Sequence, residues 1–492
     1  MRVLRSLTLL LFTFAAAAQN IDPKAVDRLM ASTLKAWNLP GAAVVIVQND
    51  RVVYAQGYGV KELGKPEPVT ADTLFQLAST SKAFTSTALA MLASDGKLSF
   101  DDPVRKHLDA FRLADSCADA AVTLRDIVSH RTGLSRHDEL WDDTTLTREE
   151  VIRAMAHVEL SRPFRSAYQY QNILFIAAGE AVAQTAGMPW EEFVRTRIFT
   201  PLRMTHTITS DSEWTRADHA TGHRYDWKSG AVTPRAAADT TTIGPAGAIK
   251  SSARDMGNWV LFHLSEGVFE GKPLVAAAQL AETKTPQTVM RMEGSSLELQ
   301  PETNLMAYGM GWNIQDYRGE QLVSHGGALN GFRTRVSLLP KRKAGFVVMI
   351  NAERGYSLLA VQNALADLLL GKPSRDWNAY YLPVDRRIDE KDEQDRLARL
   401  AQRVPDTTPS RPLADYAGPY SNEAYGTATI SLVNDTLNLQ WNRRTAPLTH
   451  FHYDVFRTES KDNEFDETVS FTLDERKKVK SLTLFGETFV RK

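Results

Sequence analysis

The sequence has a single cysteine, Cys117, among its 492 residues. One cysteine cannot form an intramolecular disulfide, so a disulfide-stapled scaffold is excluded. An excess of charge of one sign is also missing, because 58 lysines and arginines are balanced by 59 aspartates and glutamates. This balance predicts neither a nucleic-acid partner nor an anionic membrane surface. We expect Cys117 to be a small buried side chain.

The N-terminal apolar run, from Leu7 to Phe14, is far shorter than the roughly 20 residues that a membrane span needs. Arg2 and Arg5 precede the run, and the small residues 16–18 follow it. This order is typical of a secretory signal peptide. We expect cleavage after Ala18, no stable membrane anchor, and a mature protein that is secreted or periplasmic.

The composition excludes a disordered or collagen-like chain, because 43% of the residues are hydrophobic. Strand patterns at both ends of the first part of the chain enclose a helix-rich middle, which predicts an α/β core with a second, mostly helical lobe and a cleft between them. The segments that carry this prediction are a helix over Pro23–Trp37, a hairpin over Ala43–Tyr54, strands over 331–339 and 344–350, and an apolar helix over 358–370.

A densely charged stretch over 386–403, followed by three prolines up to Pro412, predicts a domain boundary. Beyond it, apolar and polar residues alternate in several short runs separated by turns, which predicts a small antiparallel barrel. We therefore divide the chain into a signal peptide (1–18), a main domain (19–375), a charged helical and proline-rich linker (376–412) and a barrel (413–492).

Ser79 and Lys82 form an SxxK pair at the predicted start of a helix that ends near Gly96. The i, i+3 spacing places both side chains on one helix face, where a desolvated lysine can take or stabilise the serine proton. The same spacing recurs at Ser94 and Lys97, but at the far end of that helix, where no anion is stabilised. Taken alone, the first pair is better explained as an N-cap serine beside a solvated lysine.

Two further motifs support a catalytic interpretation. Tyr170 and Asn172 precede a helical pattern, and a tyrosine beside an ammonium can act as a general base. A second Tyr-x-Asn at Tyr420 lies among the C-terminal strands without such a helix. The glycine-rich segment 324–328 precedes a strand, and beside an edge strand it would let a substrate backbone approach and leave an amide for an oxyanion hole. A core aromatic and a glycine-rich turn are the structural alternatives.

In this order and spacing, the three motifs resemble the penicillin-recognising serine hydrolases. The resemblance is to the class C β-lactamase branch and its relatives, the D-Ala-D-Ala carboxypeptidases, D-aminopeptidases and esterases. It covers roughly residues 21 to 375, and the C-terminal segment resembles the lipocalin-like barrel of some members. It implies an antiparallel sheet flanked by helices. Further matching segments are Val128–Leu134, Pro201–Met204, Gly247–Asp255 and Tyr308–Trp312.

The resemblance also implies roles for individual residues and no cofactor. Ser79 would be the acylated nucleophile, Lys82 its proton partner and Tyr170 the general base. Substrate would be bound by Asn172, His325 and Gly327, and the amides of Ser79 and Ala328 would form the oxyanion hole. For His130 the resemblance implies a structural role, and no ligand spacing supports a metal site that includes it and His137. Trp141 is expected either to line the cleft or to pack a surface loop.

His325 replaces the lysine of true class C β-lactamases. A histidine is mostly neutral at pH 7, so it is poorly suited to bind a substrate carboxylate. We therefore expect a secreted serine hydrolase that acts through an acyl-Ser79 intermediate on a small-molecule or peptide substrate. A peptidase or esterase, with D-amino-acid peptides as candidates, is favoured over an efficient β-lactamase. The alternatives are an acyltransferase or transpeptidase of the same fold, and a non-catalytic binding or sensor protein.

Overall fold

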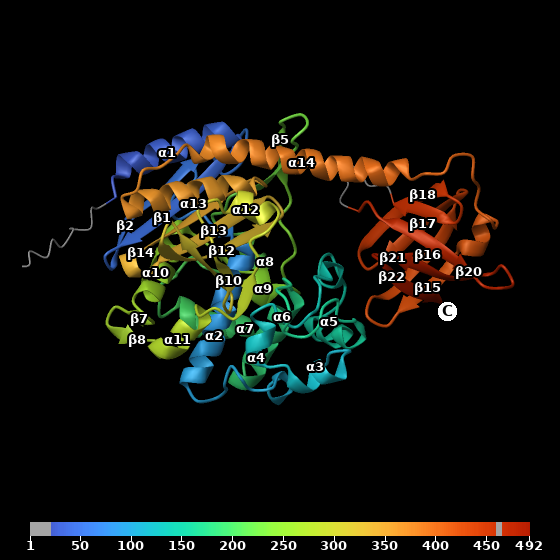
Figure 1. Cartoon of the computed structure of the whole chain (residues 1–492), viewed down its shortest axis with the longest axis horizontal. Helices are drawn as coiled ribbons and strands as arrows, with labels where there is room; N and C mark the ends of the chain where they lie inside the picture. Colours follow the sequence, from blue (N-terminus) through green and yellow to red (C-terminus); the bar gives the residue numbers. More distant parts are fainter. Residues whose placement is uncertain (1–20, 459–464) are drawn as a thin grey trace, which may run out of the picture.

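The structure is a computed structural model that describes residues 21–458 and 465–492. The predicted signal peptide lies outside the described residues. Figure 1 shows a large α/β domain and a small barrel, joined along one side by a long helix. The predicted fold class is confirmed for both parts, since the sheet is antiparallel and flanked by helices and the barrel is closed. No helix in the described part of the chain is long and apolar enough to cross a membrane.

The α/β domain is built on an eight-stranded sheet with the order β2-β1-β14-β13-β12-β11-β10-β9. Its first and last segments pair directly, with Ala42 opposite Ile350. Strand β1 is buried along its whole length, which is why its sequence is continuously apolar instead of alternating. The strands are β1 (Gly41–Gln48), β2 (Arg51–Gly59), β9 (Thr288–Met290), β10 (Met306–Tyr308), β11 (Asn313–Tyr317), β12 (Glu320–Leu329), β13 (Phe332–Leu339) and β14 (Ala344–Ile350).

Helices cover both faces of this sheet. One face packs against α1 (Pro23–Trp37), α13 (Gly355–Leu370) and the start of α14 (Trp377–Ala401). The other face packs against α10 (Ala253–Leu264) and, beyond it, the helical lobe. The predicted helices over 23–37 and 358–370 are confirmed, the second beginning three residues earlier than expected.

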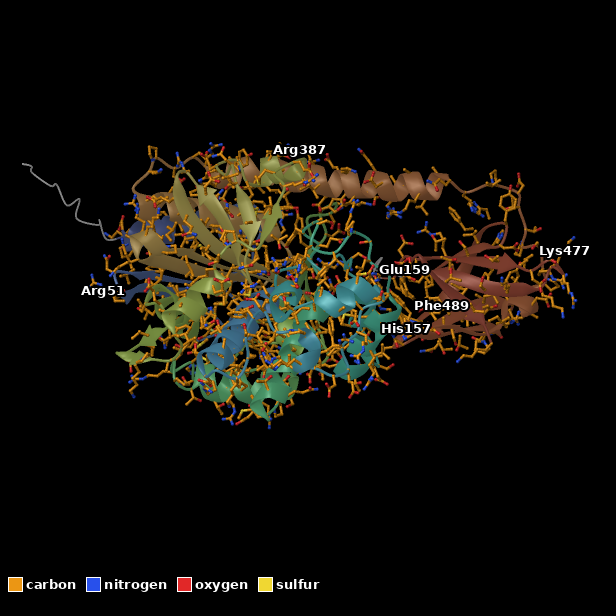
Figure 2. All side chains as sticks on the ribbon, turned by 60° about the horizontal axis from the view of Figure 1, so that its bottom comes forward. Arg51, His157, Glu159, Arg387, Lys477 and Phe489 are labelled. Carbon is orange, nitrogen blue, oxygen red and sulfur yellow. The ribbon has the colours of Figure 1, made fainter. Side chains whose placement is uncertain are left out.

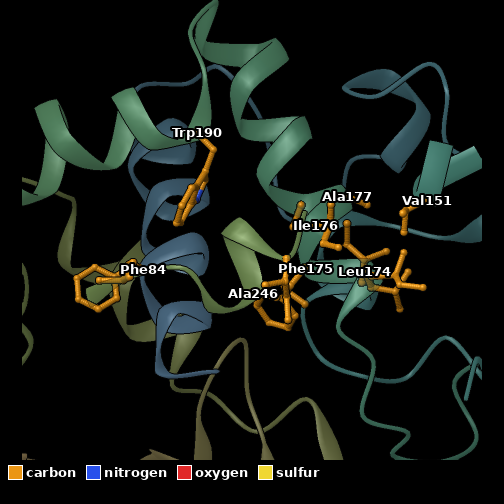
Figure 3. Close-up of a cluster of buried hydrophobic side chains, with 14 of the residues drawn as sticks. Phe84, Val151, Leu174, Phe175, Ile176, Ala177, Trp190 and Ala246 are labelled. Atoms are coloured by element: carbon orange, nitrogen blue, oxygen red, sulfur yellow. The ribbon is translucent and has the colours of Figure 1, made fainter. Parts of the chain in front are cut away.

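Helices α2 (Ser81–Ser94) and α6 (Ile173–Ala186) form the centre of the helical lobe. Nearly all of α2 is buried, including the polar residues of its first two turns. Figure 3 shows Phe84 of α2, Phe175 of α6 and Ala246 in one apolar cluster with Trp190. Because the SxxK and Tyr-x-Asn motifs lie at the starts of these two helices, this close packing determines the distance between the motifs.

The remaining elements of the domain are short. The helices are α3 (Ser116–Ala121), α4 (Leu124–Ile127), α5 (Arg148–Ala154), α7 (Trp190–Val194), α8 (Asp211–Trp214), α9 (Gly244–Gly247), α11 (Ala277–Thr283) and α12 (Ser295–Leu299). The short strand pairs are β3 (Phe75–Gln76) with β6 (Lys250–Ser251), β4 (Gly222–Tyr225) with β5 (Val232–Arg235), and β7 (Val268–Phe269) with β8 (Lys272–Pro273).

The C-terminal barrel closes through pairing of its first and last strands. The predicted alternation is confirmed, since Leu437, Leu439 and Trp441 are buried while the residues between them are more exposed. Tyr420 lies in this barrel and donates to Tyr416 O, so it is a core residue. The strands are β15 (Gly418–Asn422), β16 (Gly426–Val433), β17 (Thr436–Trp441), β18 (Arg444–His452), β19 (Val455–Thr458), β20 (Thr468–Leu473), β21 (Val479–Leu484) and β22 (Glu487–Arg491).

The expected burial of Cys117 is wrong, because its side chain is exposed. It lies in α3, a surface helix of which only Ala118 is buried. A helix this short buries a single residue against the domain, and Cys117 is the neighbour on its outer face.

Candidate active site

Ser79 lies in a short 3-10 helix, η1 (Ala78–Thr80), that runs directly into α2. The residue before it, Ala78, has a φ of 51°, in the left-handed region that non-glycine residues rarely occupy. Such conformations concentrate at active sites, where the surrounding structure holds them. Ser79 is partly exposed and lines a cavity, while Lys82 behind it is fully buried.

The amine of Lys82 makes three polar contacts. Its Nζ lies 3.0 Å from Ser79 Oγ, 2.7 Å from Asn172 Oδ1 and 3.1 Å from Ala246 O. The two carbonyl oxygens only accept, so two N–H bonds point at them. The remaining position on the nitrogen faces Ser79 and is a lone pair when the amine is neutral. Burial lowers the pKa of Lys82 well below its ordinary value, which favours this neutral, basic form.

Asp138 determines which way the Asn172 amide points. Asn172 Nδ2 donates to Asp138 Oδ1 over 2.9 Å, which leaves Asn172 Oδ1 facing Lys82. A carboxylate only accepts, so the flipped amide would lose this bond. Trp141 Nε1 and Arg136 Nε donate to the same carboxylate at 2.7 and 2.6 Å. No motif marks Asp138 in the sequence, and the substrate-binding role of Asn172 stays a prediction.

The Tyr170 hydroxyl is a second hydrogen-bond partner of the Ser79 hydroxyl, in addition to the Lys82 amine. Lys82 Nζ and Arg136 Cζ lie 4.9 and 5.2 Å from the centre of its ring. Burial raises the pKa of Tyr170 above its ordinary value, against the opposing effects of the Ser79 hydrogen bond and the Arg136 charge. The phenol is therefore protonated at neutral pH, and the general-base role stays a prediction.

His325 is buried and neutral, in agreement with the expectation from sequence. Its Nδ1 lies 2.7 Å from Gly326 O and must carry the proton, because a carbonyl only accepts. Nε2 then accepts from the Tyr308 hydroxyl at 2.9 Å. Burial lowers the pKa of His325 to about 3. Both ring nitrogens are engaged by the protein, so the imidazole presents no cation to the cavity.

The glycine-rich segment is part of strand β12 and not a turn. Strand β11 pairs with β12 only as far as Ser324, which lies opposite Asn313. From His325 to Leu329, the described part of β12 pairs with β13 alone. The segment is therefore a local edge within the sheet, and an edge has backbone groups available for another chain.

Gly327 is the point of closest approach between β12 and the segment that carries the serine. A Cβ atom at this position would lie 2.1 Å from Leu77 O and 3.1 Å from Ala78 Cβ. The absence of a side chain therefore lets β12 lie against η1, so that Ala328 and Ser79 line the same cavity. The oxyanion hole expected from their two amides stays a prediction.

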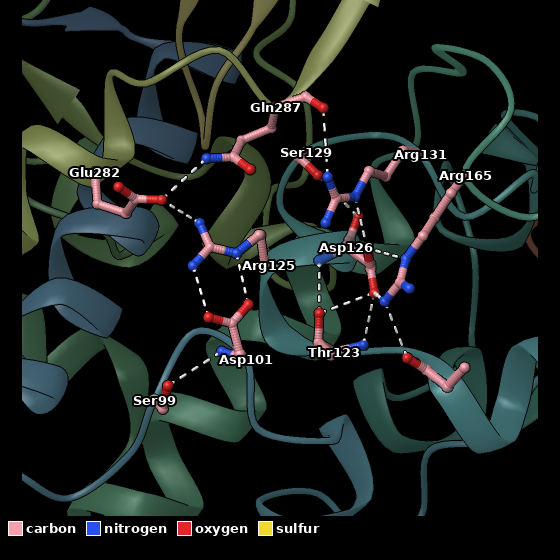
Figure 4. Close-up of polar contacts among 11 residues, drawn as sticks. Ser99, Asp101, Thr123, Arg125, Asp126, Ser129, Arg131, Arg165, Glu282 and Gln287 are labelled. Atoms are coloured by element: carbon pink, nitrogen blue, oxygen red, sulfur yellow. Dashed lines mark hydrogen bonds and ion pairs between the residues drawn. The ribbon is translucent and has the colours of Figure 1, made fainter.

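The segment from Asp126 to Arg131 combines ion pairs to a buried carboxylate with a contact to the Tyr-x-Asn segment of the site. Asp126 is fully buried and accepts from Arg131 and Arg165, each at 2.6 Å (Figure 4). Burial raises the pKa of Asp126, but its hydrogen bonds outweigh this effect and hold it below the ordinary value. Within the same segment, His130 Nδ1 accepts from the backbone N–H of Gln171 at 3.1 Å. His130 thus holds the Tyr-x-Asn segment, which fits the structural role expected for it.

A cavity of about 940 Å³ is lined by Ser79, Tyr170, Asn172, His325 and Gly327. Trp141 lines it, which agrees with one of the two expectations for this residue. Within the described ranges, no group of three or more His, Cys, Asp or Glu side chains is placed to hold a metal ion. The second SxxK pair lies elsewhere, at the far end of α2, where Ser94 Oγ donates to Ala90 O. A serine held by a buried amine and a phenol beside a strand edge is an arrangement suited to covalent acyl transfer.

The comparisons with known proteins agree with this class. The Beta-lactamase family matches residues 26–370, and a Domain of unknown function (DUF3471) matches residues 402–491. The unguisins hydrolase ungD' of Aspergillus campestris is 30% identical over 432 residues, which cover 83% of this chain and 78% of that protein. The octameric penicillin-binding protein homologue from Pyrococcus abyssi has a TM-score of 0.64 at 21% identity, covering 96% of this chain and 100% of its own. The class C β-lactamase from Rhodobacter sphaeroides has a TM-score of 0.57 at 24% identity, covering 71% and 99%.

The chain belongs to the β-lactamase family, whose members are serine hydrolases. The two solved structures share its fold, and the match to the second family begins at Gln402, directly after the end of α14, and takes in the whole barrel.

Proposed function

We propose that this protein hydrolyses esters or amides through an acyl-Ser79 intermediate, as a peptidase or esterase and not as an efficient β-lactamase. The observation that carries the proposal is the position of the buried Lys82 amine, 3.0 Å from Ser79 Oγ, with its other hydrogen bonds committed to fixed acceptors. The relative named as an unguisins hydrolase supports hydrolysis as the reaction class.

The electrostatics of the site suggest a division of roles between the two candidate proton carriers. Burial favours neutral Lys82 and protonated Tyr170. Lys82 therefore takes the Ser79 proton as Oγ bonds to the substrate carbonyl, and the oxyanion forms beside the amides of Ser79 and Ala328. As the tetrahedral intermediate collapses, the Tyr170 hydroxyl protonates the leaving group, and the Lys82 ammonium returns a proton to the phenolate. In the second half of the reaction, water takes the place of Ser79. Lys82 accepts a proton from the water as its oxygen bonds to the acyl carbon, the Tyr170 hydroxyl returns a proton to Ser79 Oγ, and the acid is released.

The substrate preference follows from His325. Its imidazole is neutral and engaged on both sides, so the third motif offers no permanent cation to the carboxylate of a β-lactam. Esters and internal peptide bonds carry no carboxylate beside the scissile bond, so they need no such cation. We also propose that the protein is exported, on the strength of the N-terminal pattern in its sequence.

The test compares the wild-type chain with Ser79→Ala and, as a matched control, Ser94→Ala. Ser94 is the serine of the second SxxK pair and lies outside the site. We expect a fluorophosphonate to add one adduct to the wild-type and Ser94→Ala chains and none to Ser79→Ala. We also expect turnover of a short-chain aryl ester to exceed that of a chromogenic β-lactam. Equal labelling of Ser79→Ala would falsify the assignment of Ser79 as the nucleophile. Faster turnover of the β-lactam than of the ester would refute the proposed substrate class.

A further inference from the structure

The C-terminal barrel contacts the loop that carries Asp138. This loop, which we call the site loop, comprises residues 135–143. Asp138 and Trp141 face the active-site cavity from its middle. Two residues of the site loop, His137 and Asp143, have left-handed backbone conformations with φ of 45° and 52°. Such conformations persist in non-glycine residues only where neighbouring contacts hold them.

The first contact lies at His137. Its Nδ1 is 2.6 Å from the hydroxyl of Tyr425, a buried residue of the barrel, and its Nε2 is 2.8 Å from Ser135 Oγ. The Tyr425 ring packs against Trp441 and Phe489 inside the barrel, so its hydroxyl is presented from a rigid position.

The second contact lies at the other end of the site loop. Arg444, at the start of β18, donates to Asp142 Oδ2 over 2.6 Å and lies 3.7 Å from the carboxylate of Asp143. The Arg444 side chain is only 16% exposed, which limits screening by solvent. Of the two left-handed residues of the loop, His137 therefore contacts the barrel directly, and Asp143 follows Asp142, which does so.

Between these two contacts, the loop reaches the catalytic amine in two hydrogen bonds. Asp138 accepts from Asn172 at 2.9 Å, and Asn172 accepts from Lys82 at 2.7 Å. We propose that Tyr425 and Arg444 of the barrel are positioning residues, which hold the site loop so that Asp138 orients Asn172 and the catalytic lysine. The barrel is then a working part of the active site and not an independent binding module. The inference rests on the proposed function, in which Lys82 takes the serine proton.

Other contacts between the two parts do not involve the site loop and serve as controls. Arg443, the residue beside Arg444, pairs with Asp239 at 2.7 Å. On the helical lobe, His157 pairs with Glu423 of the barrel at 2.9 Å. Figure 2 shows His157 at the edge of the lobe, beside the barrel. Substitution at Arg443 or Glu423 removes a polar contact between the barrel and the main domain and leaves the loop contacts in place.

The experiment uses the full chain with Tyr425→Phe and Arg444→Gln combined, and with Arg443→Gln and Glu423→Gln combined as the control. Hydrogen exchange of the site loop is measured without substrate, and the rate of Ser79 acylation is measured with a fluorophosphonate across pH. We expect the first pair to raise loop exchange and to slow acylation about tenfold, with the control pair unchanged. The acid limb of the pH profile should move to lower pH, because the Asp138 carboxylate that raises the pKa of Lys82 withdraws.

The double variant is checked by exchange across the barrel, which should stay at wild-type protection. If it does not fold, Tyr425→Phe alone removes one hydroxyl and keeps the ring, and Arg444→Lys should restore most of the rate lost in Arg444→Gln. Unchanged loop exchange overturns the proposal, as does a loosened loop with an unchanged acylation rate and pH profile. A wild-type chain that takes no label refutes the proposed function instead, and the loop exchange then supports or overturns the coupling on its own.

Discussion

Replacing Gly327 by alanine should disable the site while leaving the fold in place. The added Cβ would lie 2.1 Å from Leu77 O and 2.5 Å from Thr334 Oγ1. Favourable contact between non-bonded heavy atoms begins near 3.5 Å, so strand β12 must withdraw from the serine segment by about 1 Å. A displacement of about this size at an active site costs on the order of 10²-fold in rate. If the withdrawal also removes the Ala328 amide from the oxyanion, the loss reaches about 10²–10³-fold, or about 2.7–4 kcal/mol.

The neighbouring glycine supplies the control for this experiment. A Cβ at Gly326 would lie 3.3 Å from Arg335 Nη1, the end of a flexible side chain, and 3.7 Å from Thr334 O. Gly326→Ala should therefore acylate within a few-fold of wild type. The measurement is the second-order rate of fluorophosphonate labelling, with thermal unfolding recorded in parallel. A Gly327→Ala chain that labels as fast as Gly326→Ala would refute the reasoning, because the close approach of β12 would then have no catalytic consequence.

Three further outcomes are expected. Acylation should slow as the pH falls through the lowered pKa of Lys82, because protonation removes the base; a rate that increases toward acid pH contradicts this. Asp126→Asn should reduce the free energy of unfolding by about 1.5–3 kcal/mol, since Arg131 and Arg165, which are themselves partly exposed, lose their hydrogen bonds to a charged partner. The pKa of Asp126 is depressed in the fold, so its contribution is complete above the unfolded value of about 3.9 and is lost as the pH falls through the folded value. Urea melts of both chains should therefore converge in acid, and a constant gap would count against the ion pairs. His325→Lys should raise the ratio of β-lactam to ester turnover about tenfold, as a hydrogen bond to a charged group allows; an unchanged ratio would place carboxylate recognition elsewhere.

The elements that carry the site could be predicted because each motif lies at the start of a helix or beside a strand with a clear hydrophobic period. Ser79 and Lys82 share a helix, so their contact follows from local spacing. The contact of Lys82 with Asn172, 90 positions along the chain, was not predicted, because the family resemblance gave Asn172 only as a substrate-binding residue. The glycines of 324–328 favour a turn as much as a strand, so the sequence does not identify this segment as part of β12. The need for glycine at position 327 follows only from the packing of η1 against β12.

The contacts that support the site could not be predicted from sequence. Asp138 lies in a loop without periodicity, and its partner Asn172 belongs to a different motif. The contact between His137 and Tyr425 joins positions separated by 288 residues and depends on how two folded domains dock. No sequence pattern near either residue predicts this contact, because His137 is typical of a loop and Tyr425 is typical of a barrel core. The exposure of Cys117 was missed for a similar reason, since its short helix offers too few residues to show which side faces the core.

The pairing of β1 with β14 also has a consequence for how the protein is made. The strand at Gly41–Gln48 leaves the ribosome early, but its partner at Ala344–Ile350 follows only after the whole helical lobe. Ser79 is likewise synthesised long before Tyr425 and Arg444, which contact the site loop. Sheets that depend on such distant pairings fold slowly, since the intervening chain must close first. The nascent chain therefore carries Ser79 before the contacts around it are complete, and if the barrel positions the site loop as proposed, the full rate of acylation is reached only after the last domain has emerged and docked.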